Sequence, residues 1–137
     1  MKKTDTHYIF ELPIKVRDYE VDSEGIVNNA IYLHYLEHTR HEFCESAGFT
    51  FRDMHAQGID PVLSKVAIEY KTPLRLGGSM ISKLALSRKG PLFVFIQDIF
   101  TPEGDVVVKA KVWVATLVNG RLSRGEVLFE RFKDYLE

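Results

Sequence analysis

The chain has 137 residues, of which 45% are hydrophobic and 27% are charged, and its formal net charge is −1. This length and composition are typical of one globular domain with a buried core, so we expect a single domain over residues 1–137. Lysine and arginine are scattered and no apolar run is long enough to span a bilayer, which argues against nucleic-acid and membrane partners.

The first residues along the chain, Met1 to Thr6, lack the hydrophobic stretch of a signal peptide. We therefore expect a cytoplasmic protein. Cys44 is the single cysteine, so an internal disulfide is excluded, and we interpret Cys44 as a small buried residue.

Alternating apolar and polar residues predict a strand over residues 10–17. An acidic loop follows, and Asn28 then precedes an apolar-periodic segment that ends at Gly48. This pattern predicts a helix over residues 28–47, with Asn28 as its N-cap and Gly48 as its stop. The apolar face of this helix comprises Tyr32, Tyr35, Leu36, Thr39, Phe43 and Ala47.

Beyond residue 60 the spacing of apolar residues changes from the three-and-four repeat of a helix to the two-residue repeat of strands. A short helical turn is predicted over residues 51–57, strands over 62–71, 80–87, 92–96 and 106–118, and a terminal helix over 126–136. In the first of these strands Val62, Val66, Ile68 and Tyr70 are expected on one face. Asn119-Gly120 is a strong hairpin signal after the last strand.

This order of elements predicts an α+β fold in which an antiparallel sheet of five or six strands wraps around one long central helix. Such a sheet has exposed edge strands. Pairing of these edges between copies predicts a homodimer or homotetramer.

The junction between the acidic loop and the long helix is the candidate site. A helix start offers unpaired backbone N–H groups and a positive dipole end, which together stabilise an oxyanion. Asp22 lies six residues before Asn28, close enough to act there as general base or nucleophile. The alternative interpretation of the acidic cluster Asp18, Glu20, Asp22 and Glu24 is a solvated loop without a catalytic role. An acid next to such donors favours acyl transfer or hydrolysis.

Histidines on the long helix raise the question of a metal. His34 and His38 have the spacing of a zinc pair, but no glutamate follows His34 directly, so we expect no metal there. With His41 they are better explained as a solvated face or a subunit contact. The chain has no phosphate loop or dinucleotide fingerprint, and no cofactor is expected.

Residues 22–32, Asp-Ser-Glu-Gly-Ile-Val-Asn-Asn-Ala-Ile-Tyr, followed by residues 33–40, carry a recognisable pattern. They resemble the opening helix of hot-dog-fold thioesterases of the 4-hydroxybenzoyl-CoA thioesterase family. Residues 68–74, Ile-Glu-Tyr-Lys-Thr-Pro-Leu, look like the strand of that family that ends before its glycine turn. The resemblance implies a hot-dog fold, two subunits that join their sheets, and an acyl-CoA substrate bound across the interface.

The resemblance also implies roles for individual residues. Asp22 matches the catalytic aspartate of the family, which acts as nucleophile or as base for water, and the N–H near Asn29 matches the contact to the thioester carbonyl. Some relatives carry histidine at the position of Asn29 and tyrosine at that of Asp18, so auxiliary roles are not transferred to these two. The remaining motif residues are candidate substrate-binding residues: Gly25, Ile26, Val27, Asn28 and Tyr32.

Two other functions fit the same fold. A non-catalytic acyl-CoA binding or sensor module would hold the ligand without hydrolysing it. A dehydratase for 3-hydroxyacyl thioesters would need a histidine and an acid across the groove, and His7 and His55 have no supporting motif. Glu37 and Glu45 remain weaker candidates for the catalytic acid, because another branch of the fold uses a helix carboxylate.

Overall fold

The computed structural model describes residues 6–137, so most of the N-terminal segment discussed above lies outside the described residues. The elements in chain order are β1 (Phe10–Lys15), the 3₁₀ turn η1 (Asp18–Glu20), α1 (Ile31–Ser46), α2 (Phe51–Ala56), β2 (Ile59–Tyr70), β3 (Ser79–Lys89), β4 (Leu92–Phe100), β5 (Val106–Val118), β6 (Arg121–Leu122), α3 (Glu126–Phe132) and the 3₁₀ turn η2 (Lys133–Tyr135).

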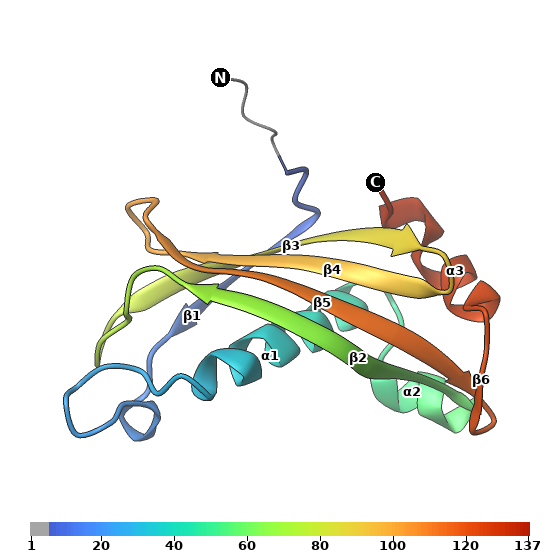
Figure 1. Ribbon diagram of the computed structural model, residues 1–137, viewed down its shortest axis with the longest axis horizontal. Coiled ribbons are helices and arrows are strands. Elements are labelled where there is room, and N and C mark those ends of the chain that lie inside the picture. Colours follow the sequence, from blue (N-terminus) through green and yellow to red (C-terminus); the bar gives the residue numbers. More distant parts are fainter. Residues whose placement is uncertain (1–5) are drawn as a thin grey trace.

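The strands form one antiparallel sheet in the order β1-β3-β4-β5-β2, with the short β6 added to β5. The sheet arches over α1, which lies along its concave face (Figure 1). β1 and β2 are the two edge strands of the sheet. This is the hot-dog fold that was expected, with the long helix at its centre.

The apolar face of α1 is buried against the sheet, as its spacing predicts. Tyr32, Tyr35, Leu36 and Phe43 are each at most 3% exposed. Phe132 of α3 closes one end of this core, with its ring centroid 5.4 Å from that of Phe93. Within residues 6–137 no helix is long and apolar enough to cross a membrane.

The start of α1 differs from the sequence expectation. The helix begins at Ile31 rather than Asn28, and Ala30 is its N-cap residue. The Asn28 side chain accepts the Ala30 N–H at 2.9 Å, while its carbonyl accepts the Ile31 N–H at 2.9 Å. Asn28 therefore closes a separate turn before the helix. The Asn28 side chain accepts a backbone N–H two residues ahead, as an N-cap side chain does. For this reason the predicted first residue of the helix, Asn28, lies three residues before the observed one, Ile31.

The set of β2 residues that share one face of the strand also differs from the prediction. The strand begins at Ile59, and a bulge shifts its register between Leu63 and Lys65. Leu63 and Val66 pair with Val114 and Val112, which point to the same face because they are two residues apart. The prediction that Val62 shares this face is wrong, since the extra residue of the bulge reverses the alternation before it.

Candidate active site

The loop between η1 and α1 folds back on itself. The Asp22 N–H donates to the Ile26 carbonyl at 2.8 Å, and the Gly25 N–H donates to the Asp22 carbonyl at 3.0 Å. Gly25 has a φ of 79°, in the left-handed region that a residue without Cβ adopts at low cost. Gly25 therefore lets the loop close in a tight turn.

Asp22 lies exposed in this loop. Its Oδ1 accepts the N–H of Glu24 at 2.8 Å and that of Ile26 at 3.4 Å. Its other oxygen, Oδ2, accepts none of the hydrogen bonds within residues 6–137. One oxygen thus orients the carboxylate in the loop, and the second is available to water or a substrate.

The amides that lead into α1 differ in whether they are paired. The N–H of Asn28 donates to the Glu20 carbonyl at 3.1 Å, and those of Ala30 and Ile31 donate to Asn28. The N–H of Asn29 makes no hydrogen bond in the described part of the chain. This unpaired amide lies two residues before the first residue of the 16-residue helix α1, where a hydrogen-bond donor could meet an anionic group.

A small pocket of about 110 Å³ is lined in part by Asn29. It gathers four of the predicted site residues, whereas Asp22, Gly25 and Asn28 are not among those that line it. Tyr70 was not predicted to belong to the site, although the period-two pattern placed it on the same face of its strand as Val66 and Ile68. The lining residues are Ile26, Val27, Asn29, Tyr32, Tyr70, Lys71, Thr72 and Pro73.

The two tyrosines of this pocket hold its walls together. The Tyr70 hydroxyl donates to the Asn29 carbonyl at 3.2 Å, and its ring lies 5.5 Å from that of Tyr32. The Tyr32 hydroxyl oxygen accepts the Leu74 N–H at 3.1 Å. Burial raises the pKa of Tyr32, so it stays a neutral phenol at physiological pH. Its phenol links α1 to the segment after β2.

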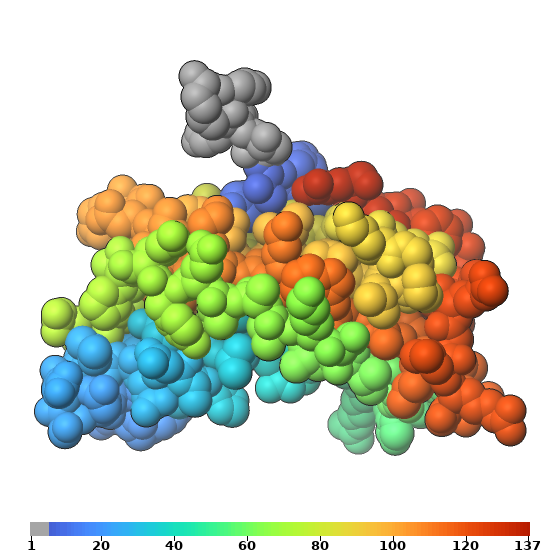
Figure 2. Space-filling model, in the orientation of Figure 1, coloured from blue at the N-terminus to red at the C-terminus, as the bar shows by residue number. Residues whose placement is uncertain are grey.

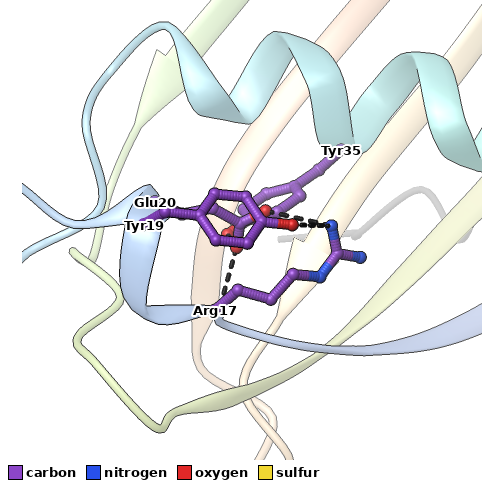
Figure 3. Close-up of polar contacts among 4 residues, drawn as sticks. All are labelled: Arg17, Tyr19, Glu20 and Tyr35. Carbon is purple, nitrogen blue, oxygen red and sulfur yellow. Dashed lines mark hydrogen bonds and ion pairs between the residues drawn. The ribbon is translucent and has the colours of Figure 1, made fainter.

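Glu20 contradicts the interpretation of the acidic loop as wholly solvated. It is 5% exposed, and its Oε1 accepts the Arg17 N–H at 2.8 Å and the Tyr35 hydroxyl at 2.7 Å. Figure 3 shows Tyr35 reaching from α1 to this carboxylate, and Arg17 Nη1 donates to its Oε2 at 3.3 Å. Burial and the bond to Glu20 raise the pKa of Tyr35. Glu20 thus anchors the loop that carries Asp22 to the helix.

Cys44 is confirmed as a buried residue. It is 0% exposed, and burial raises the pKa of its thiol to about 12. A thiol that stays protonated behind protein atoms is a poor nucleophile.

The histidines of α1 lie at the surface. His34, His38 and His41 are exposed, and the His41 ring packs against Phe51 with centroids 4.3 Å apart. Within residues 6–137 no group of three or more histidine, cysteine, aspartate or glutamate side chains is placed to hold a metal ion.

Comparison with known proteins identifies the family. The family model of the thioesterase-like superfamily matches residues 16–121, which contain the loop, α1 and β2. The chain belongs to the thioesterase-like superfamily. All the predicted site residues, and Tyr70 with them, lie within the matched range.

Individual members of the thioesterase-like superfamily are similar to this chain. The Arabidopsis thaliana protein named acyl-acyl carrier protein thioesterase ATL3, chloroplastic, is 33% identical over 109 residues, which cover 76% of this chain and 57% of that protein. The chain thus matches little more than half the length of this plant relative. The acyl-CoA thioester hydrolase YbgC of Escherichia coli is 29% identical, over 77% of this chain and 80% of YbgC.

A solved structure supports the fold of this superfamily member. The crystal structure of a protein from Aquifex aeolicus is 32% identical, covers 87% of this chain and 96% of its own, and superposes with a TM-score of 0.81. The sheet and its central helix are therefore shared over nearly the full length.

Proposed function

We propose that this chain is an acyl-CoA thioesterase, which hydrolyses an acyl-CoA thioester to a free acid and CoA in the cytoplasm. The observation that carries the proposal is the unpaired N–H of Asn29, a residue that lies two positions before α1 and lines a pocket. Membership of the thioesterase-like superfamily and the printed names of its relatives point to the same reaction.

In the proposed mechanism the Asn29 N–H polarises the thioester carbonyl. As water or a carboxylate attacks, negative charge develops on that oxygen, and a preorganised donor is typically worth about 2.7–4 kcal/mol to the transition state. Asp22 acts as nucleophile or as the base that deprotonates water, through the oxygen that its loop leaves unpaired. Gly25, Ile26, Val27, Asn28 and Tyr32 shape the binding site around it.

The proposed assembly is a homodimer or homotetramer that joins its sheets through β2. This edge strand is 12 residues long, and Leu63 and Tyr70 on it are 58% and 47% exposed. In Figure 2 the atoms of β2, in green, lie at the front surface along its length with no other segment over them. A long uncovered edge with apolar side chains favours pairing with a second copy.

The test is the variant Asp22→Asn. The amide keeps an oxygen that accepts the Glu24 N–H, so the loop is expected to persist while the negative charge is lost. Loss of a general base typically costs about 10²–10⁴-fold in rate, and we expect kcat to fall within that range with little change in thermal stability. Thiol release from an acyl-CoA series measures kcat, and Glu24→Gln serves as control. Hydrolysis by Asp22→Asn at the rate of the control would contradict the proposed role of Asp22.

A second candidate function is a non-catalytic acyl-CoA binding module. The observation that favours it is the engagement of Asp22 Oδ1 by two amides of its own loop, which is a structural use of the carboxylate. Binding of acyl-CoA without thiol release from any acyl-CoA or acyl carrier protein thioester would establish this function instead. The two carriers are both needed in the assay, because the relatives are named for each.

A further inference from the structure

A second, larger cavity runs beside α1. Its volume is about 550 Å³, and it lies between one side of α1, the edge strand β2 and the concave face of the sheet. Most of its walls are apolar, with Leu36, Val66, Phe95, Val112 and Phe132 among the lining side chains. Such a space suits the hydrocarbon part of an elongated ligand.

The cavity begins next to the proposed reaction centre. Ala30, which directly follows Asn29, lines one end, and Arg40 lines it further along the same helix. Ten residues of α-helix span about 15 Å, and a helical side chain points back toward the N-terminus. The Arg40 guanidinium therefore lies less than that length from the start of α1. An acyl group with its carbonyl at Asn29 would extend toward it.

Arg40 is the unusual member of this wall. Its Nη1 donates to Gln97 Oε1 at 3.0 Å, and Gln97 Nε2 donates to the Leu36 carbonyl at 2.9 Å, so a fully buried glutamine fixes the guanidinium. Arg40 makes no ion pair within residues 6–137. The nearby Glu37 carboxylate lies 4.0 Å from His41 Nε2 instead.

The other nitrogen atoms of Arg40 are not fully buried. Among the described residues, Thr116 Oγ1 is the one fully buried side-chain nitrogen or oxygen atom without a hydrogen-bond partner, so the unbonded Arg40 nitrogens keep some accessible surface in a residue that lines the cavity. Burial lowers the pKa of Arg40, although nearby Glu37 opposes this, and an arginine remains a cation at neutral pH. Glu37, which lines the same cavity, compensates part of the Arg40 charge without forming an ion pair with it, and a ligand carboxylate at the guanidinium would add a direct partner.

We propose that Arg40 is a specificity residue that selects acyl groups with a hydrogen-bond-accepting oxygen, a carboxylate above all, at a distance from the thioester. This rests on the proposed thioesterase function. The planar guanidinium is matched to a carboxylate, with two parallel N–H donors for its two oxygens, whereas a plain hydrocarbon chain leaves the charge unpaired.

The experiment compares acyl-CoA substrates matched in chain length. Adipoyl-, suberoyl- and sebacoyl-CoA are set against hexanoyl-, octanoyl- and decanoyl-CoA and against the ω-hydroxy analogues of these, with kcat/KM measured by thiol release. At the best length we expect a preference of about 10- to 100-fold for the carboxylate, the factor that one charge-assisted hydrogen bond provides. A preference for the ω-hydroxy compound alone, with none for the carboxylate, would contradict selection by the charge of Arg40.

The variants separate a contact with the acyl group from a structural role. Arg40→Met is expected to bring the ratio of kcat/KM for carboxylated to plain substrate close to one, and Arg40→Lys to retain part of it. Arg121→Met, at an exposed position in β6, removes a positive charge elsewhere and should leave the ratio unchanged. A wild-type ratio near one at every chain length, or an equal loss for both substrates in Arg40→Met, overturns the proposal.

The same pairs made as non-hydrolysable thioethers separate this inference from the function on which it rests. Their affinities are measured by calorimetry, which needs no turnover. Thiol release without any preference for oxygen in kinetics or binding refutes the role of Arg40 and leaves the thioesterase standing. Absence of thiol release from every substrate, with preferential binding of the oxygen-bearing thioethers, refutes the thioesterase and retains the selectivity of Arg40.

Discussion

At the scale of residues, carboxylates close together in the chain have different roles. Glu20 is buried and bonded to Tyr35 and Arg17, while Asp22 is exposed and bonded only to its own loop. Burial with full hydrogen bonding is typical of a structural acid. An exposed acid with one unpaired oxygen fits a group that meets a substrate.

Glu20 is predicted to contribute to stability. In Glu20→Ala the Tyr35 hydroxyl and the Arg17 N–H lose their acceptor, and a buried polar group left unpaired costs about 1–3 kcal/mol. We expect the free energy of unfolding, measured by urea denaturation, to fall by this amount. Glu24→Ala, at an exposed position in the same loop, is the matched control and should change it by less than about 0.5 kcal/mol. Equal stability of the two variants would contradict the role of Glu20.

The candidate site was partly predictable from single residues. Asp22, Gly25 and Asn29 follow one another within one motif, so their neighbourhood is a local property of the chain. Tyr70 and Arg40 were not identified, because their roles depend on contacts with residues far along the sequence. Tyr70 bonds Asn29 across 41 positions, and Arg40 bonds Gln97 across 57.

At the scale of elements, a polar contact inside the core helps to dock α1 on the sheet. Thr39 Oγ1 lies 2.7 Å from Ser82 Oγ of β3, and both residues are 0% exposed. Thr39 Oγ1 also donates to the Tyr35 carbonyl at 2.8 Å. The threonine was predicted to lie on the apolar face of the helix. Its hydrogen bond with Ser82 offsets the free-energy cost of burying the hydroxyl.

The contact between α1 and β3 is predicted to show coupling in a double-mutant cycle. Thr39→Val leaves the Ser82 hydroxyl without its side-chain partner and should lower the free energy of unfolding by about 1–3 kcal/mol. Adding Ser82→Ala should cost less in the Thr39→Val background than alone, with an interaction energy of about 0.5–3 kcal/mol. Chemical denaturation of the four proteins measures this. Strictly additive effects would show that the two hydroxyls do not stabilise each other.

The elements themselves were largely predictable, and the errors have physical causes. Period-two and three-and-four patterns located every major strand and helix, because the apolar faces that pack on the core repeat at those spacings. The predictions for the first residue of α1 and for the face of β2 that carries Val62 were wrong. In both places a local hydrogen-bonding turn or a bulge changes the backbone without changing the apolar pattern.

At the scale of the whole molecule, the proposed pairing of two copies depends on the uncovered edge strand β2. Leu63 stands at this edge and also lines the larger cavity. Pairing through β2 would therefore bring a second copy beside the cavity, so assembly and substrate binding are expected to depend on the same strand.

Leu63→Lys is predicted to weaken the proposed dimer. A charge on an edge strand disfavours pairing with another copy, because the ammonium would be desolvated at the interface. We expect sedimentation velocity over a range of concentrations to show a shift toward the monomer. Leu122→Lys replaces another exposed leucine, on β6, and is the control. An unchanged mass distribution for Leu63→Lys would place the interface elsewhere.

The sequence by itself determined the order of elements, the central helix and the motif around Asp22 and Asn29, because each depends on residues within one or two turns of one another. Tertiary structure alone decided which amide is unpaired, which acid is buried, and which cation faces the cavity. Those properties depend on groups brought together from distant positions, since burial and pairing are set by what the fold places opposite a side chain and not by its neighbours in the chain.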